Sequence, residues 1–180
     1  MKNFLSLVFE VLKIFIIALA IVIPVRYFLF QPFIVKGHSM DPNFSDGDYL
    51  IIDEISYKLR SPQRGEVIVF DPPTNPSDRY IKRIIGLPGE TLEIKDGTVF
   101  IYKDDNPQPL DENYLPKDLK TLGSLKISLD NNEYFVLGDN RTASLDSRRF
   151  GVITKEKIIG KVYLRAWPFT AFAKIEAPAY

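Results

Sequence analysis

Two side chains in this sequence are suited to act together as a nucleophile and its base. Ser39 lies in a segment containing Gly and Pro, residues 37–42, and Lys82 lies in an apolar, strand-like run, residues 80–85. A serine hydroxyl is a weak nucleophile at neutral pH and needs a base beside it. A lysine that burial keeps partly neutral can serve as that base. The pair therefore predicts nucleophilic catalysis if the fold brings the two side chains together.

The single histidine, His38, is a poor candidate for the base. It is the immediate neighbour of Ser39, and adjacent side chains of an extended chain point to opposite faces. An Asp or Glu base remains an alternative in principle. The chain has no Cys, which excludes disulfides and a cysteine nucleophile, and one His cannot build a His-based zinc cage. The sequence therefore predicts neither a metal nor a cofactor.

The surroundings of Lys82 decide whether its amine can be neutral. Alternate residues of a strand share a face, so Tyr80 and Ile84 are expected beside Lys82. Such apolar neighbours disfavour the charged form and lower the pKa of a lysine. From the alternation alone, however, a solvated lysine on an exposed face is the simpler interpretation. Ser39 taken alone is likewise typical of a turn residue or helix cap.

A third segment, residues 138–148, has the polar composition of a solvated surface loop. In this order, the three segments resemble the motifs of bacterial type I signal peptidases, membrane-bound Ser–Lys proteases that cut signal peptides from exported proteins. The resemblance extends from about residue 26 to residue 168. The matching residues are Ser39-Met40-x-Pro42, Tyr80 to Arg83 with Gly86-Leu87-Pro88-Gly89, Gly138 to Arg141 with Ser144 to Arg148, and Arg165 to Pro168.

The resemblance implies a role for each motif residue. Ser39 would be the nucleophile and Lys82 the general base. Ser144 would form a hydrogen bond with the Lys82 amine, and an ion pair between Asp146 and Arg148 would fix the loop. Orienting the base in this way is the support that such a site requires.

The nucleophile segment both matches and departs from the family pattern. Met40 and Tyr80 are motif residues expected at the site. Gly37 occupies a position where some members carry a serine hydroxyl for the oxyanion, so the resemblance implies a hole built from backbone N–H groups, most simply that of Ser39. The departures are Asn43-Phe44 in place of the usual Thr-Leu, His38 directly before Ser39, and Thr154 in place of a frequent proline.

The N-terminal segment, residues 1–30, is predicted to be an uncleaved membrane anchor. Its uninterrupted apolar core, residues 14–25, is short for a span, so the helix is expected to begin earlier, with Lys13 near the interface. A cleavable signal peptide is the main alternative, because this core has the length of an h-region. Against it, the small-x-small triplet Ala18-Leu19-Ala20 lies in the middle of the apolar run. A buried core helix of a globular domain is disfavoured, because helices in globular proteins seldom lack a polar face over so many residues.

The charges that flank the apolar core say little about the orientation of the predicted helix in the membrane. Lys2 and Lys13 precede it and Arg26 follows it, so the positive-inside bias is slight. The resemblance, rather than the charge count, places the chain in the bacterial cell membrane as a single-pass protein. Its N-terminus would lie in the cytosol and its catalytic domain on the extracytoplasmic side.

The rest of the chain is predicted to be mostly β: a curled antiparallel sheet, residues 31–180, with an insertion at about residues 87–137. Turn signals separate the strand-like runs, and Asp96-Gly97 is the strongest hairpin signal among them. Residues 103–123 are polar, with three prolines, and indicate a loop or small lobe. The expected strands are residues 48–54, 66–70, 79–85, 91–95, 98–102, 133–137 and 158–167.

The resemblance implies a membrane-bound serine endopeptidase that cleaves N-terminal signal peptides from exported preproteins. Its partners would be these signal peptides and the lipid bilayer. Nucleic acid is not expected, because Lys plus Arg and Asp plus Glu both number 23. Two alternatives stay open: another Ser–Lys maturation protease of the same superfamily, or a non-catalytic, membrane-tethered β binding domain. The sequence predicts no particular oligomeric state.

Overall fold

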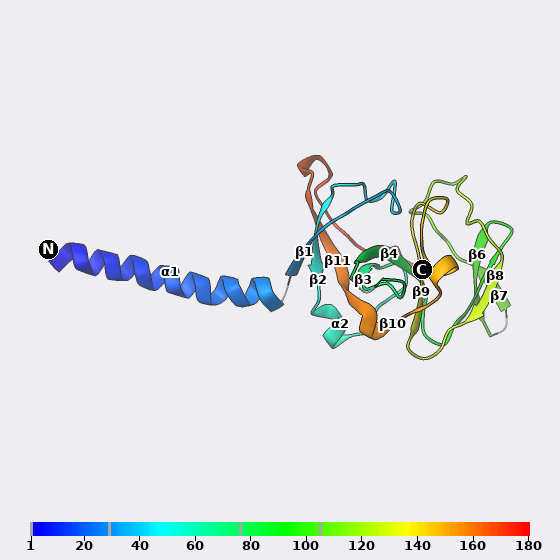
Figure 1. The fold of residues 1–180 in the computed structure, drawn as a ribbon, viewed down its shortest axis with the longest axis horizontal. Helices are drawn as coiled ribbons and strands as arrows, with labels where there is room; N and C mark the ends of the chain where they lie inside the picture. Colours follow the sequence, from blue (N-terminus) through cyan, green and yellow to red (C-terminus); the bar gives the residue numbers. More distant parts are fainter. Residues whose placement is uncertain (1, 29, 76, 105) are drawn as a thin grey trace.

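The computed structural model describes residues 2–28, 30–75, 77–104 and 106–180, without the side chains of residues 2, 3, 5 and 21–30. Helix α1, Lys2–Phe28, is one continuous helix that extends away from the β-rich remainder of the chain (Figure 1). The side chains of the last third of the predicted anchor, residues 21–30, therefore lie outside the described part. Among the described residues, no helix combines the length and hydropathy required of a membrane span.

The main sheet is antiparallel and holds the candidate site. Its eight strands run in the order β1-β2-β11-β3-β4-β9-β10, with β12 paired to β11. Irregular register along β11 bends the sheet where this strand meets β2 and β3. The strands are β1 Phe30–Ile34, β2 Tyr49–Asp53, β3 Val67–Phe70, β4 Tyr80–Gly86, β9 Glu133–Leu137, β10 Ile153–Thr154, β11 Ile158–Trp167 and β12 Ala173–Lys174.

A second sheet of four strands lies beyond β9 (Figure 1). Its order is β7-β6-β5-β8, with β5 Thr91–Lys95, β6 Thr98–Lys103, β7 Asn106–Pro109 and β8 Leu125–Ser128. The predicted hairpin at Asp96-Gly97 is confirmed, because both residues have positive φ, 52° and 85°, as a tight β5–β6 turn requires. Strand β9, which lies within the predicted insertion at residues 87–137, pairs with β4 in the main sheet.

Short helical turns fill the connections. They are α2 Ser56–Leu59, α3 Ser147–Phe150 and the 3₁₀ turns η1 Lys155–Lys157 and η2 Phe169–Ala171. Asp146 caps α3 by accepting the Arg148 backbone N–H. The predicted mostly-β fold with a curled antiparallel sheet is confirmed, and within the described residues its helical parts are helix α1 and these short turns.

Strand β4 lies in the interior of the main sheet, between β3 and β9. Its second to seventh residues are all buried, because both faces of the strand are covered. On one face lies a cluster containing Met40, Phe44 and Ile81, and on the other a cluster containing Ile68 and Ile84. A charged residue in this strand is therefore buried whichever face it occupies.

Candidate active site

The Ser39 segment leaves β1 and turns across the end of the main sheet. Gly37 has a φ of +82°, and its N–H donates to Asp46 Oδ1 at 2.7 Å. The N–H of Phe44 donates to the carbonyl oxygen of Met40 at 3.0 Å, which closes a turn just after Ser39. Met40 and Phe44 are both buried in the core. Their burial holds the turn against the core, while Ser39 faces a groove on the surface that is described below.

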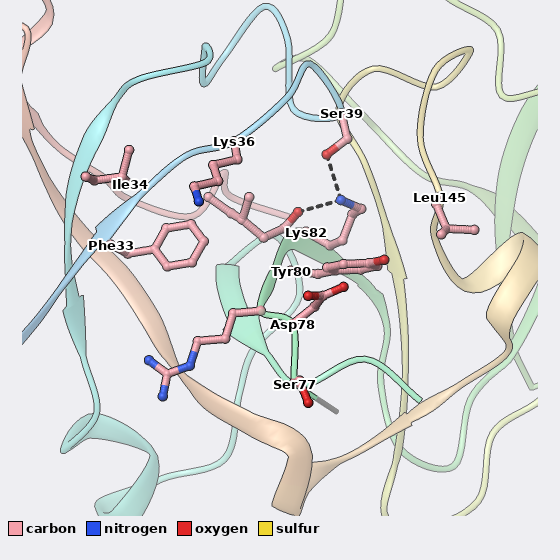
Figure 2. Close-up of a pocket in the computed structure, with 11 residues that line it drawn as sticks. Phe33, Ile34, Lys36, Ser39, Ser77, Asp78, Tyr80, Lys82 and Leu145 are labelled. Atoms are coloured by element: carbon pink, nitrogen blue, oxygen red, sulfur yellow. Dashed lines mark hydrogen bonds between the residues drawn. The ribbon is translucent and has the colours of Figure 1, made fainter. Parts of the chain in front are cut away.

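The structure brings Ser39 and Lys82 together (Figure 2). Lys82 lies in the middle of β4, opposite Ile68 of β3, and is 4% exposed. Its Nζ lies 2.7 Å from Ser39 Oγ and donates a hydrogen bond to the carbonyl oxygen of Ile81 at 2.8 Å. A serine hydroxyl and a lysine amine at this distance can exchange a proton directly.

Burial lowers the pKa of Lys82 from its ordinary value of 10.5 to about 8, although the charges of Asp146 and Asp139 oppose the shift. The Tyr80 ring, whose centroid lies 5.5 Å from Nζ, shares this strand face with Lys82, as the alternation predicted. The interpretation that alternation alone favoured, a solvated lysine on an exposed face, is therefore wrong. The amine is instead held where a general base needs it.

His38 has a different partner. Its side chain is 72% exposed, and Nδ1 lies 3.0 Å from Asp41 Oδ2. Lys82, rather than an imidazole or a carboxylate, is the group that meets the Ser39 hydroxyl. The expectation that a histidine adjacent to the nucleophile makes a poor base agrees with this arrangement.

The polar segment 138–148 is built around Asp146. The predicted ion pair is present: Arg148 Nε and Nη2 donate to the two Asp146 oxygens, each at 2.8 Å. Asp146 Oδ2 also accepts the Gly138 N–H at 3.1 Å. The pair thus links the end of β9 to the start of α3, and fixes the loop that lies against the Ser39 turn.

Ser144 differs from the expectation. Its Oγ is buried without a hydrogen-bond partner among the described residues, so the implied bond to the Lys82 amine is not formed. The amine instead uses Ser39 Oγ and the Ile81 carbonyl oxygen. Ser144 nevertheless lies at the site, because a Cβ added to Gly138 would overlap both Ser144 Oγ and the Ser39 carbonyl oxygen.

A buried ion pair beside the site was not predicted. Arg83 follows Lys82 in β4, and its Nε and Nη2 donate to the two oxygens of Asp139 at 2.8 and 2.6 Å. Asn140 donates its backbone N–H to the Ser39 carbonyl oxygen at 3.1 Å and its side-chain amide to that of His38 at 3.0 Å. The available signal was a second cation inside an apolar strand, because a buried arginine requires a carboxylate partner.

A groove of about 470 Å³ opens beside the Ser39–Lys82 pair (Figure 2). One wall comes from β1 and its continuation, and the other from the segment that leads into β4. The lining residues include Phe33, Ile34, Lys36, Tyr80 and Leu145. Ser39 and Lys82 also line this groove, so a molecule that occupies it would lie next to the Ser39 hydroxyl.

A serine hydroxyl that meets a desolvated lysine at the edge of such a groove is an arrangement that could support nucleophilic hydrolysis. Residues 8–167 match the family described as signal peptidase, peptidase S26. The chain therefore belongs to the signal peptidase family, a family of serine proteases.

Two curated relatives and one solved structure illustrate this similarity. The chain is 39% identical over 165 residues to a probable signal peptidase I-2 of Synechocystis sp., across 88% of this chain and 73% of that protein. It is 36% identical over 173 residues to signal peptidase IB of Staphylococcus aureus, across 87% of each. A crystal structure of a signal peptidase I from Enterococcus faecalis V583 is 34% identical, with a TM-score of 0.49, and the match covers 57% of this chain and 97% of that one.

Proposed function

We propose that this protein is a membrane-tethered endopeptidase that removes N-terminal signal peptides from exported preproteins by a Ser39–Lys82 dyad. The observation that carries the proposal is the 2.7 Å contact between Ser39 Oγ and the buried Lys82 Nζ. The lowered pKa of Lys82, about 8, leaves a usable fraction of neutral amine near neutral pH.

The reaction follows from this geometry. Lys82 Nζ takes the proton of Ser39 Oγ as that oxygen attacks the scissile carbonyl carbon. The protonated amine then gives this proton to the leaving amine nitrogen as the C–N bond breaks, which leaves an acyl-enzyme ester on Ser39. Neutral again, Lys82 takes a proton from water, and the resulting hydroxide attacks the ester carbonyl. Return of the proton to Ser39 Oγ releases the acid product.

The oxyanion needs donors that the folded chain does not already use. The backbone N–H of Ser39 suits this role, because it donates to no acceptor among the described residues. Gly37 supplies no hydroxyl and leaves open space, since a Cβ added there would meet nothing within 4 Å.

The remaining residues expected at the site would position this dyad. Tyr80 covers the amine and limits its hydration, while Met40 fixes the Ser39 turn by its burial. Asp146 and Arg148 hold the neighbouring loop. The preprotein would lie extended in the groove and add a strand beside the continuation of β1, as peptides do at an exposed sheet edge.

The N-terminal segment, residues 1–30, would be a single-pass anchor in a bacterial cell membrane, and residues 31–180 the extracytoplasmic catalytic domain with its insertion at about 87–137. Helix α1 supports this division by its continuity over 27 residues, about 40 Å at 1.5 Å per residue. The apolar side chains that are described between Phe4 and Leu19 are exposed. The anchor would hold the dyad near the membrane face and raise its effective concentration for membrane-inserted preproteins.

The test uses the full chain in detergent micelles with a preprotein as substrate. Ser39→Ala and Lys82→Met should each abolish cleavage at the signal-peptide junction, and the double variant should be little worse than either single one, because the two residues act as a unit. Lys95→Met, on an exposed position of β5, is the matched control and should cleave normally, as should His38→Ala. Substantial cleavage by folded Lys82→Met would refute the dyad. Cleavage by none of these proteins, wild type included, would favour a non-catalytic binding domain.

A further inference from the structure

Asn43 connects the nucleophile turn to two other parts of the molecule. It lies four residues after Ser39, and its side-chain amide donates both of its protons: one to Asp139 Oδ2 at 2.8 Å, the other to the carbonyl oxygen of Tyr114 at 2.9 Å. An asparagine amide has two protons to donate, whereas a threonine hydroxyl has one. The residue present at this position is therefore able to hold two acceptors at once.

The first of these acceptors also holds the strand that carries the base. Asp139 is fully buried, and its carboxylate accepts two hydrogen bonds from Arg83, the residue after Lys82. One carboxylate thus receives donors from the nucleophile turn and from β4. The Asn43 amide therefore fixes the position of the Ser39 turn relative to the strand that presents Lys82.

The second acceptor belongs to the segment between β7 and β8. The Tyr114 ring lies over the Arg83 guanidinium, 4.1 Å from ring centroid to Cζ. Its hydroxyl donates to Glu112 at 2.7 Å and accepts from Arg141 at 3.1 Å. Arg141 is buried and donates to the carbonyl oxygen of Gly138 at 3.0 Å. Through Tyr114, the polar segment of residues 103–123 contacts both the base strand and the nucleophile turn.

We propose that Asn43 and Tyr114 are positioning residues for the dyad, through which residues 103–123 hold Ser39 Oγ within hydrogen-bond reach of Lys82. The inference rests on the proposed function and gives residues 103–123 a role in it. Neither residue touches the reacting atoms. Both act through the alignment of the Ser39 turn, for which a displacement of about 1 Å costs on the order of a hundredfold in rate.

The test compares Asn43→Leu and Asn43→Thr in the full chain in detergent, with Asn132→Leu as the matched control. Asn132 is exposed, lies outside residues 103–123, and donates its side-chain amide to both carboxylate oxygens of Glu156 at 2.9 Å. Asn43→Leu should lower kcat roughly a hundredfold and change KM for a short peptide less than about twofold, because alignment rather than binding is lost. Asn43→Thr should fall between Asn43→Leu and wild type, since it keeps one donor. Asn132→Leu should match wild type.

A second measurement separates positioning from folding. By NMR, the Lys82 amine of Asn43→Leu should titrate closer to its ordinary value than in wild type, because a loosened turn admits water to the amine. A folded Asn43→Leu with wild-type kcat and unchanged Lys82 titration would overturn the proposal. So would a wild-type kcat in Asn43→Thr, because the contact with Tyr114 would then be dispensable. If the wild-type chain cleaves no preprotein, the proposed function fails, and the Lys82 titration alone still decides whether the link exists.

Discussion

The acidic limb of the pH–rate profile should lie near pH 8. With a pKa of about 8, Lys82 is neutral in about one free enzyme molecule in ten at pH 7 and about one in a hundred at pH 6. A lysine at the ordinary value of 10.5 would be neutral in about three molecules in ten thousand at pH 7. Burial therefore raises the population of competent base roughly 300-fold.

The same shift has a cost in stability, and its sign follows from the protons bound. Between pH 8 and 10.5 the unfolded chain holds the Lys82 proton that the native state has lost, so the free energy of unfolding rises with pH across this window. Across this window the free energy of unfolding rises by about 3 kcal/mol in total. The cost is fully present below the folded pKa of about 8 and disappears as pH passes 10.5.

Two measurements check this reasoning. Hydrolysis of an uncharged fluorogenic peptide, recorded as kcat/KM from pH 5.5 to 9.5, should fall about tenfold per pH unit below pH 8. Urea unfolding gives the free energies of unfolding of wild type and Lys82→Met, and the difference between them should change by about 3 kcal/mol between pH 8 and 10.5. The other titrating groups are the same in both proteins, so their contributions cancel in this difference. A rate profile that stays flat down to pH 6, together with a constant difference in unfolding free energy, would refute the buried base.

Two further predictions concern the glycine beneath the site and the anchor. Gly138→Ala should lower kcat/KM roughly a hundredfold in a folded protein, because its Cβ would displace the carbonyl of Ser39. An unchanged rate, measured beside thermal unfolding, would show that the Ser39 turn tolerates this shift. Removal of residues 1–28 should leave short-peptide hydrolysis intact but slow the processing of preproteins inserted in liposomes. Equal loss on both substrates, or a mature protein in cells that begins after residue 20, would contradict the tether.

The strands with strong local signals could be predicted from the sequence. Strands β2, β3, β4, β5, β6, β9 and β11 each fall on an expected run, because turn residues flank them on both sides. Strand β7 was missed: it contains Pro107 and Pro109 and lies in the polar segment predicted as a loop or lobe. Prolines are tolerated there because β7 is at the edge of its sheet, and an edge position depends on the partner strand rather than on the local sequence.

In the candidate site, too, contacts between residues close in sequence could be predicted, whereas contacts between distant residues could not. The ion pair of Asp146 and Arg148 joins residues two apart, and the motif was sufficient to predict it. The contacts of Asn43 with Tyr114 and Asp139 join residues 71 and 96 positions apart, and no periodicity encodes them. The missing bond of Ser144 has a similar origin, because Ser144 and Lys82 are far apart in the sequence and no periodicity encodes the distance between their side chains.

Lys82 and Arg83 show why two adjacent cations of one strand have opposite properties. Each is 4% exposed, so burial penalises both charges. For Arg83, the hydrogen bonds and charge of Asp139 outweigh burial, and its pKa is raised. For Lys82, burial outweighs the more distant Asp146 and Asp139, and its pKa is lowered. The amine meets a hydroxyl and a carbonyl oxygen instead of a carboxylate. A carboxylate beside Lys82 would keep the amine charged, and so would remove the base that the proposed chemistry requires.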